Sequence, residues 1–181
     1  AEAQPILADV LTNGVTSKGM AYGLEDDLDN NFNALTENGK ESIFAVQYSN
    51  AAENMGGAAF CLAYPHNTGP GGCCGFYQPS FELVNSFQVD ANGLPYLNGE
   101  YRTKKSVSVR NSDSSQDAVL AVNDNNIAVD PRLDFAVGRF GIPYKDWGFP
   151  ENGWVRDATN GGIFMPKKHV YSKAEDAAGM K

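Results

Sequence analysis

"DPRLDFAVGRFGIPYKDWGF", residues 130–149, is the stretch that says most about how this chain folds. It opens with Asp130-Pro131-Arg132, where the proline keeps the residue before it out of a helix and the aspartate can accept backbone hydrogen bonds. We therefore expect a structural corner in which Arg132 pairs with an acidic side chain. Residues 133–140 then alternate, which predicts a strand with one face on the core. The core-facing side chains are expected to be Leu133, Phe135 and Val137.

The rest of this stretch, residues 141–149, loses the alternation and gathers aromatic rings among glycines and a proline. Core packing is the commoner position for any one such ring. A Trp or Tyr ring also offers a flat apolar face that suits the C–H face of a pyranose, and Asn, Asp or Arg side chains beside it can bond the hydroxyl rim. Core packing and sugar stacking both stay open for the individual rings. Trp147, Trp154 and Tyr64 are the preferred rings for stacking on a sugar. The candidate ligand-binding residues are Trp147, Trp154, Tyr64, Tyr144, Tyr77, His66, Asn152 and Arg156.

Upstream of this stretch, apolar periodicity predicts a mixture of helices and strands. Helices are expected at residues 5–12, which are followed by Gly14, and at residues 24–35, where Leu24, Leu28 and Phe32 share one face. A strand is expected at residues 41–49, a long glycine-rich loop at 50–75 and a helix at 78–87. Residues 98–126 are polar and predict an exposed connection, and the polar tail at 171–181 predicts a linker or a fraying end.

Composition limits the classes of partner. The 181 residues favour one domain, and the formal net charge of −8 argues against nucleic acid as a partner. A neutral or cationic partner suits this charge better. No stretch is long and apolar enough to predict a transmembrane helix, and the first residues do not resemble a signal peptide, so a targeting segment would lie outside this sequence.

Three cysteines, Cys61, Cys73 and Cys74, cannot all pair within the chain. One disulfide between Cys61 and either Cys73 or Cys74 is compatible with the spacing, and buried thiols are the alternative. A zinc site that adds His66 would need two adjacent ligands, which strains a tetrahedron, so no metal and no cofactor are predicted.

Signals for catalysis are weak. Glu82, Asp130 and Asp134 have no spacing that indicates a pair of catalytic carboxylates, and neither a nucleophile motif nor a phosphate-binding loop is present. No catalytic residue is therefore predicted. A hydrolase remains an alternative only because an acidic chain offers many carboxylates.

Three stretches occur in order with variable loops between them: ENGKESIFAVQYS at 37–49, FYQPSFELVNSFQVDANGLP at 76–95 and DPRLDFAVGRFGIPYKDWG at 130–148. Together they resemble the SusD/RagB family of outer-membrane nutrient-binding lipoproteins of Bacteroidetes. The resemblance covers nearly the whole chain.

This resemblance implies an α+β fold, mainly helical with much irregular structure, that the family builds on tetratricopeptide-like helix pairs. Residues 1–36 would supply scaffold helices, and residues 37–181 would form the irregular ligand-binding region. The chain is expected to be an internal fragment that stops before the family's later helical repeats. Because none of its cysteines matches the family's lipidated cysteine, membrane contact would be made only through a lipid anchor outside this sequence.

The implied function is non-catalytic capture of an oligosaccharide or polysaccharide at the extracellular face of the outer membrane, followed by its delivery to a TonB-dependent transporter. Binding rings vary between members of the family, so the eight candidate residues rest on their chemistry alone. Two alternatives stay open: a fragment of a glycoside hydrolase, and a purely structural module that contacts the transporter.

Overall fold

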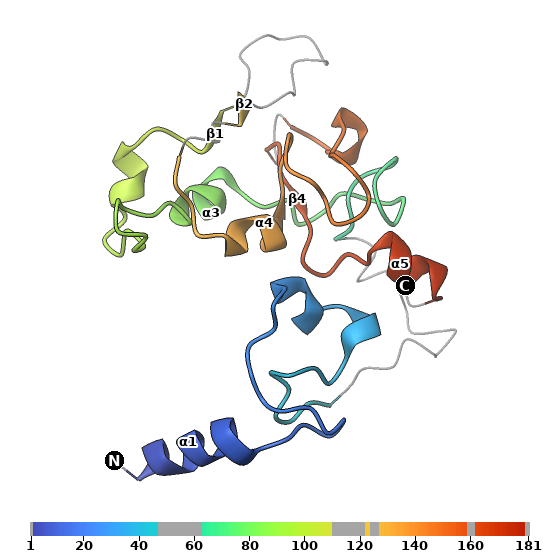
Figure 1. Cartoon of the computed structure of the whole chain (residues 1–181). Coiled ribbons are helices and arrows are strands. Elements are labelled where there is room, and N and C mark those ends of the chain that lie inside the picture. Colours follow the sequence, from blue (N-terminus) through green and yellow to red (C-terminus); the bar gives the residue numbers. More distant parts are fainter. Residues whose placement is uncertain (1, 47–62, 110–121, 124–126, 159–161, 180–181) are drawn as a thin grey trace. The chain divides into compact units, whose positions relative to one another are not determined.

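A computed structural model describes residues 2–46, 63–109, 122–123, 127–158 and 162–179 (Figure 1). Cys61 and the end of the predicted strand at 41–49 lie outside these ranges. The chain divides into a first unit, Ala1–Met55 with Ala174–Lys181, and a second unit, Gly56–Lys173. No helix in the described ranges is both long and apolar enough to cross a bilayer.

Helix α1 (Ala3–Asn13) opens the first unit and confirms the helix predicted at 5–12. Gly14 ends it, and the Gly14 backbone N–H donates to the Val10 carbonyl at 2.9 Å. None of its residues is buried, and the apolar stripe that contains Ile6 and Leu11 is exposed.

The helix predicted at 24–35 is wrong. Two 3-10 turns take its place, η1 (Leu28–Asn31) and η2 (Ala34–Thr36). Asp27 accepts a hydrogen bond from the Asp29 backbone N–H at 2.9 Å, and Asn33 accepts one from Leu35 at 2.8 Å. Such side-chain bonds offer the backbone an alternative to continuous helix.

The described part of the strand predicted at 41–49 is irregular, so that prediction is wrong for residues 41–46. Ser42 closes a turn by donating to the Gly39 carbonyl at 3.1 Å, and no described segment pairs with this run. The apolar side chains of Ile43, Phe44 and Val46 are therefore exposed. The polar tail holds a helix, α5 (Lys173–Ala177), with Glu175 buried, which corrects the expectation of a linker or fraying end.

In the second unit, α3 (Phe81–Ser86) confirms the helix predicted at 78–87, and the Ser80 hydroxyl caps it by accepting from the Leu83 N–H at 3.1 Å. Val84 is fully buried on its inner face. The described part of the connection predicted at 98–126 is only partly exposed. It contains the turn η3 (Glu100–Thr103), with Tyr101 buried, and strand β1 (Ser108–Val109), which pairs antiparallel with β2 (Val122–Asn123).

The corner at residues 130–132 is confirmed. Asp130 accepts from the Arg132 backbone at 2.9 Å and also pairs with its guanidinium. The strand predicted at 133–140 is wrong for residues 133–136, which belong to α4 (Arg132–Ala136), and is confirmed only for the two-residue strand β3 (Val137–Gly138). Asp130 and Pro131 favour this helical start, since their carbonyls accept from Leu133 at 3.0 Å and Asp134 at 3.2 Å.

Strand β3 pairs antiparallel with β4 (Met165–Pro166), so that Val137 lies opposite Pro166. The core of this unit brings together side chains from many short segments. Leu133 and Val137 are buried as expected, whereas Phe135 is only half-buried. Arg139, at 4% exposure, donates to both Asp134 carboxylate oxygens, at 2.8 and 2.9 Å.

The described chain is thus mostly irregular, with short helices and two antiparallel strand pairs. This agrees with a mixed fold rich in irregular structure, but not with a mainly helical one.

Candidate functional site

Four rings in the second unit form what we call the aromatic row: Trp147, Tyr171, Tyr64 and His169. Trp147 meets Tyr171 edge-on with centroids 6.0 Å apart, and Tyr171 meets Tyr64 edge-on at 5.6 Å. Tyr64 in turn stacks with His169 at 6.1 Å. The first three residues are half-buried and His169 is exposed, so the row combines packing with contact to solvent.

Polar contacts hold both ends of the row. The Trp147 indole N–H donates to the Tyr171 carbonyl at 2.8 Å, and the Lys173 ammonium lies 5.4 Å from the Trp147 ring centre. At the other end, the His169 Nε2 lies 3.3 Å from the Ala63 carbonyl. Partial desolvation of the imidazole lowers the pKa of His169, and the nearby Lys145 charge acts in the same direction. The histidine is therefore neutral at neutral pH.

The glycine-rich segment before residue 76 packs its backbone directly against these rings. Gly71 has a φ of +82°, and a Cβ built on it would lie 2.7 Å from Cγ of Tyr64. Gly75 has a φ of +63°, and its N–H donates to the Tyr64 carbonyl at 3.0 Å. Only glycine permits both the left-handed backbone and the close approach.

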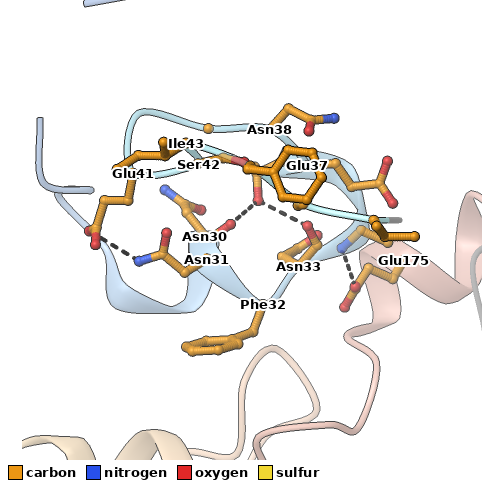
Figure 2. A pocket seen from close by; sticks show the side chains of 16 residues that line it. Asn30, Asn31, Phe32, Asn33, Glu37, Asn38, Glu41, Ser42, Ile43 and Glu175 are labelled. Atoms are coloured by element: carbon orange, nitrogen blue, oxygen red, sulfur yellow. Dashed lines mark hydrogen bonds between the residues drawn. The ribbon is translucent and has the colours of Figure 1, made fainter. Parts of the chain in front are cut away.

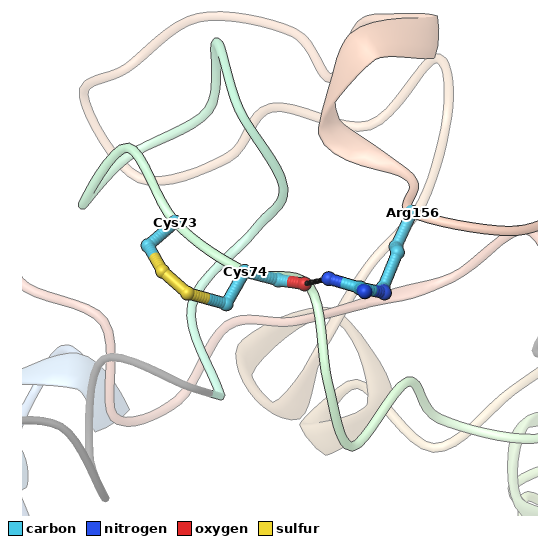
Figure 3. The surroundings of a disulfide bond; sticks show 3 residues. All are labelled: Cys73, Cys74 and Arg156. Atoms are coloured by element: carbon cyan, nitrogen blue, oxygen red, sulfur yellow. Dashed lines mark hydrogen bonds between the residues drawn. A yellow bond between two sulfur atoms is a disulfide. The ribbon is translucent and has the colours of Figure 1, made fainter.

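His66 and Arg156 meet at Gly75, where a Cβ would lie 2.8 Å from the Cβ atoms of both side chains. The Arg156 guanidinium donates to the Cys74 carbonyl at 2.7 Å (Figure 3). It also lies 4.2 Å from the Phe76 ring centre. Cys73 and Cys74 are joined to each other as a vicinal disulfide. Cys61, whose pairing with either of them the spacing left open, lies outside the described residues.

Tyr144 and Trp154 do not present free faces. They are 0% and 6% exposed, and they meet edge-on at 5.3 Å inside the core. The Tyr144 hydroxyl donates to the Pro166 carbonyl, and burial raises the pKa of this phenol well above its ordinary value. The expectation that either ring stacks on a ligand is corrected here, because protein atoms cover both.

The remaining candidates differ in how accessible they are. Tyr77 is 75% exposed and has a left-handed φ of 57°. Asn152 lies in the turn η5 (Asn152–Trp154), where its Oδ1 and the Trp154 Nε1 are buried without a hydrogen-bond partner among the described residues. The Trp154 carbonyl accepts from the His66 backbone N–H at 2.8 Å, which ties η5 to the glycine-rich segment. Asn152 therefore lies in a turn that is bonded to the glycine-rich segment, but its side-chain oxygen is buried.

Sequence reasoning missed several residues that belong to this region: Tyr171, His169, Phe76 and Lys173. Tyr171 was assigned to the polar tail, where its aromatic character was the one available signal. A second feature was also missed, an amide-lined cavity in the first unit around residues 30–46, which the run NNFN at 30–33 could have indicated. Across the described residues, no group of three His, Cys, Asp or Glu side chains is arranged to hold a metal ion.

Comparison with known proteins supports one family. Curated proteins give no match to this chain. A family model, that of the SusD family, matches residues 40–178, which include α3, α4 and every ring of the aromatic row. The matched segment covers most of the sequence, and this chain belongs to the SusD family.

Proposed function

We propose that this chain is the glycan-binding part of a cell-surface nutrient-uptake protein, and that it binds an oligosaccharide on the aromatic row without catalysing a reaction. The SusD family as a whole points to glycan binding for nutrient uptake at the outer membrane. One observation carries the finer proposal: within a chain of that family, four rings lie in contact and remain partly open to solvent.

The chemistry of the row supports a sugar as ligand. Trp147 and Tyr64 offer flat apolar surface, and their neighbours bring hydrogen-bonding groups close to it. A neutral His169 that donates its Nε2–H to the Ala63 carbonyl keeps Nδ1 as an acceptor for a sugar hydroxyl. Tyr77 and Arg156 would contact a longer oligosaccharide. Both lie close to Gly75, whose backbone N–H is bonded to the Tyr64 carbonyl.

Partners follow from the family. A TonB-dependent outer-membrane transporter would receive the glycan, and a lipid anchor outside this sequence would hold the protein on the extracellular face. Tetratricopeptide-like helix pairs would complete the fold, with α1 belonging to one such pair. Two other functions would use the same chain differently: a glycoside hydrolase would turn a glycan over, and a structural module would contact only the transporter.

The test is a glycan array with the chain, followed by calorimetry on the best oligosaccharide. An aromatic contact contributes about 0.5–1.5 kcal/mol beyond area burial, so Trp147→Ala and Tyr64→Ala should each weaken binding about 2- to 12-fold. Phe149→Ala, at an exposed ring outside the row, is the matched control and should leave affinity unchanged.

Each alternative has its own signature in the same experiments. Release of reducing ends that one carboxylate substitution abolishes would establish a hydrolase and refute the binding proposal. Undiminished binding by the Trp147→Ala/Tyr64→Ala double variant would remove the aromatic row from the site. Transporter binding without any glycan binding would favour the structural module.

A further inference from the structure

The first unit contains a cavity of about 710 Å³ that the proposed function does not use. It is lined by residues 30–34, 36–39 and 41–46 together with Glu175, all within this unit (Figure 2). Small-molecule sites in proteins typically occupy roughly 300–1,000 Å³, so the cavity is large enough for a ligand.

Side chains hold the wall of this cavity in place. The Thr36 hydroxyl lies 2.7 Å from the Asn30 carbonyl and 3.1 Å from the Asn33 carbonyl, joining η1 to η2. Glu175 is only 4% exposed and accepts from the Ala34 backbone N–H at 2.8 Å. The wall is therefore organised before any ligand arrives, which reduces the entropy lost on binding.

Amide groups give the wall both donors and acceptors. Asn33 uses its carbonyl oxygen to cap Leu35, which leaves its NH₂ group as a donor. Asn31 uses its NH₂ group on Glu41 at 3.1 Å, which leaves its carbonyl oxygen as an acceptor. The Asn30 side chain makes no hydrogen bond within the described part of the chain and is among the side chains that line the cavity in Figure 2. Sugar hydroxyls, which donate and accept at once, match such a mixed lining.

An aromatic ring and the local charge narrow the ligand further. Phe44 lines the cavity and is 89% exposed, so it offers an apolar face beside the amides. The charged side chains of the lining are all carboxylates: Glu37, Glu41 and Glu175. Hydrogen bonds from the Glu25 backbone and from Asn31 lower the pKa of Glu41, so this group stays ionised at neutral pH. These three carboxylates outweigh the Lys18 ammonium that donates to the Glu37 carbonyl, so an anionic sugar would be disfavoured relative to a neutral one.

We propose that this cavity is a second carbohydrate site that takes a neutral sugar unit and discriminates against uronic acids and sulfated sugars. The inference rests on the proposed function for its ligand class, and it adds a site in a different unit together with a charge preference.

The experiment titrates the chain with the methyl glycosides of glucose, galactose, mannose and N-acetylglucosamine, and with methyl glucuronide and methyl galacturonide. Binding is followed by saturation-transfer NMR and calorimetry. Asn30→Ala removes the unengaged amide and should weaken binding of the preferred neutral glycoside on the order of threefold to tenfold, the range expected for one hydrogen bond. Phe44→Ala should weaken it to a similar degree.

Matched controls lie in the same unit but outside the cavity. Asn13→Ala removes an exposed amide from the end of α1, and Leu24→Ala removes an apolar side chain that is 82% exposed. Both should leave affinity unchanged. Because Phe44 is so exposed, its truncation should not unfold the chain, and circular dichroism checks this. If the Phe44→Ala variant unfolds, the affinity of the Asn30→Ala variant alone decides whether the cavity binds the glycoside.

The outcomes separate this inference from the proposed function. Glycoside binding that Trp147→Ala lowers and Asn30→Ala leaves intact refutes the second site while the aromatic row stands. Uronides that bind as tightly as neutral glycosides refute the charge preference, and with it this proposal. Absence of binding by every neutral glycoside refutes the second site. If longer oligosaccharides bind in that case, the proposed function survives, and if they do not, both fail.

Discussion

Replacing Gly71 by alanine should disturb the Tyr64 ring far more than the same change at Gly72. Both glycines have left-handed backbones, with φ values of +82° and +62°. An L-residue in this conformation costs about 1–2 kcal/mol. At Gly72 the nearest atom to an added Cβ is the Asn67 carbonyl oxygen, 3.8 Å away, so backbone strain is the whole effect.

At Gly71 the new methyl group would also collide with Tyr64, since its Cβ would lie 2.7 Å from Cγ and 2.9 Å from Cε2 of the ring. Tyr64 packs against the core and contacts Tyr171 and His169, so the ring can move only by disturbing its neighbours. Overpacking of this kind costs about 1–3 kcal/mol. Gly71→Ala should therefore destabilise the chain by about 2–5 kcal/mol, against about 1–2 kcal/mol for Gly72→Ala.

Equilibrium urea unfolding and thermal unfolding measure this difference. For a chain of this size, an excess of about 1–3 kcal/mol corresponds to roughly 2–12 °C in Tm. The excess should disappear in a Tyr64→Ala background, because the side chain that collides with the methyl group is gone. Gly71→Ala should also lower oligosaccharide affinity, whereas Gly72→Ala should preserve it.

Two results would refute this reasoning. One is a Gly71→Ala variant no less stable than Gly72→Ala. The other is an excess of the same size with and without the Tyr64 ring, which would place its cause outside the contact between Gly71 and Tyr64.

Two further predictions concern the framework. Leu133→Ala, at a position with 0% exposure, should lower the free energy of unfolding by about 2–5 kcal/mol. Leu97→Ala, at a position with 87% exposure, should change it by less than about 0.5 kcal/mol. Equal losses for the two variants in urea unfolding would contradict the assigned core. Hydrogen bonds from Arg132 lower the pKa of Asp130. Its stabilising contribution is therefore present above the unfolded-state pKa of about 3.9 and is lost as the pH falls through the lower folded-state value. Asp130→Asn should accordingly flatten the loss of Tm on acidification below about pH 4, and an unchanged acid profile would count against the pairing.

Local sequence was sufficient to predict the features that depend on residues close together in the chain. Helix α1 and its end at Gly14 follow from periodicity and a glycine stop. The corner at Asp130 follows from proline geometry and the reach of a short carboxylate. Burial of Leu133 and Val137 was also predicted, although Leu133 lies in helix α4 and only Val137 lies in a strand. The two residues are spaced i, i+4, which suits one face of a helical turn as well as one face of a strand.

The predictions that failed depended on partners distant in sequence or on competing local bonds. The apolar run at 41–46 has strand composition, but a strand needs a neighbour for its backbone groups, and no described segment supplies one. Leu24, Leu28 and Phe32 have helical spacing, yet the side chains of Asp27 and Asn33 bond the backbone and turn it into two 3-10 turns.

The sequence by itself determined the family, the acidic charge, the local turns and the set of rings able to stack on a sugar, because these depend on residue identity and short-range geometry. Only the tertiary structure decided which rings are available. Trp147 and Trp154 lie seven positions apart and look alike in sequence, yet Trp154 packs against Tyr144 in the core while Trp147 joins Tyr171 and Tyr64 in the half-open row. The reason is physical: exposure of a ring depends on which distant segments pack over it, and these contacts form only when the whole chain has folded.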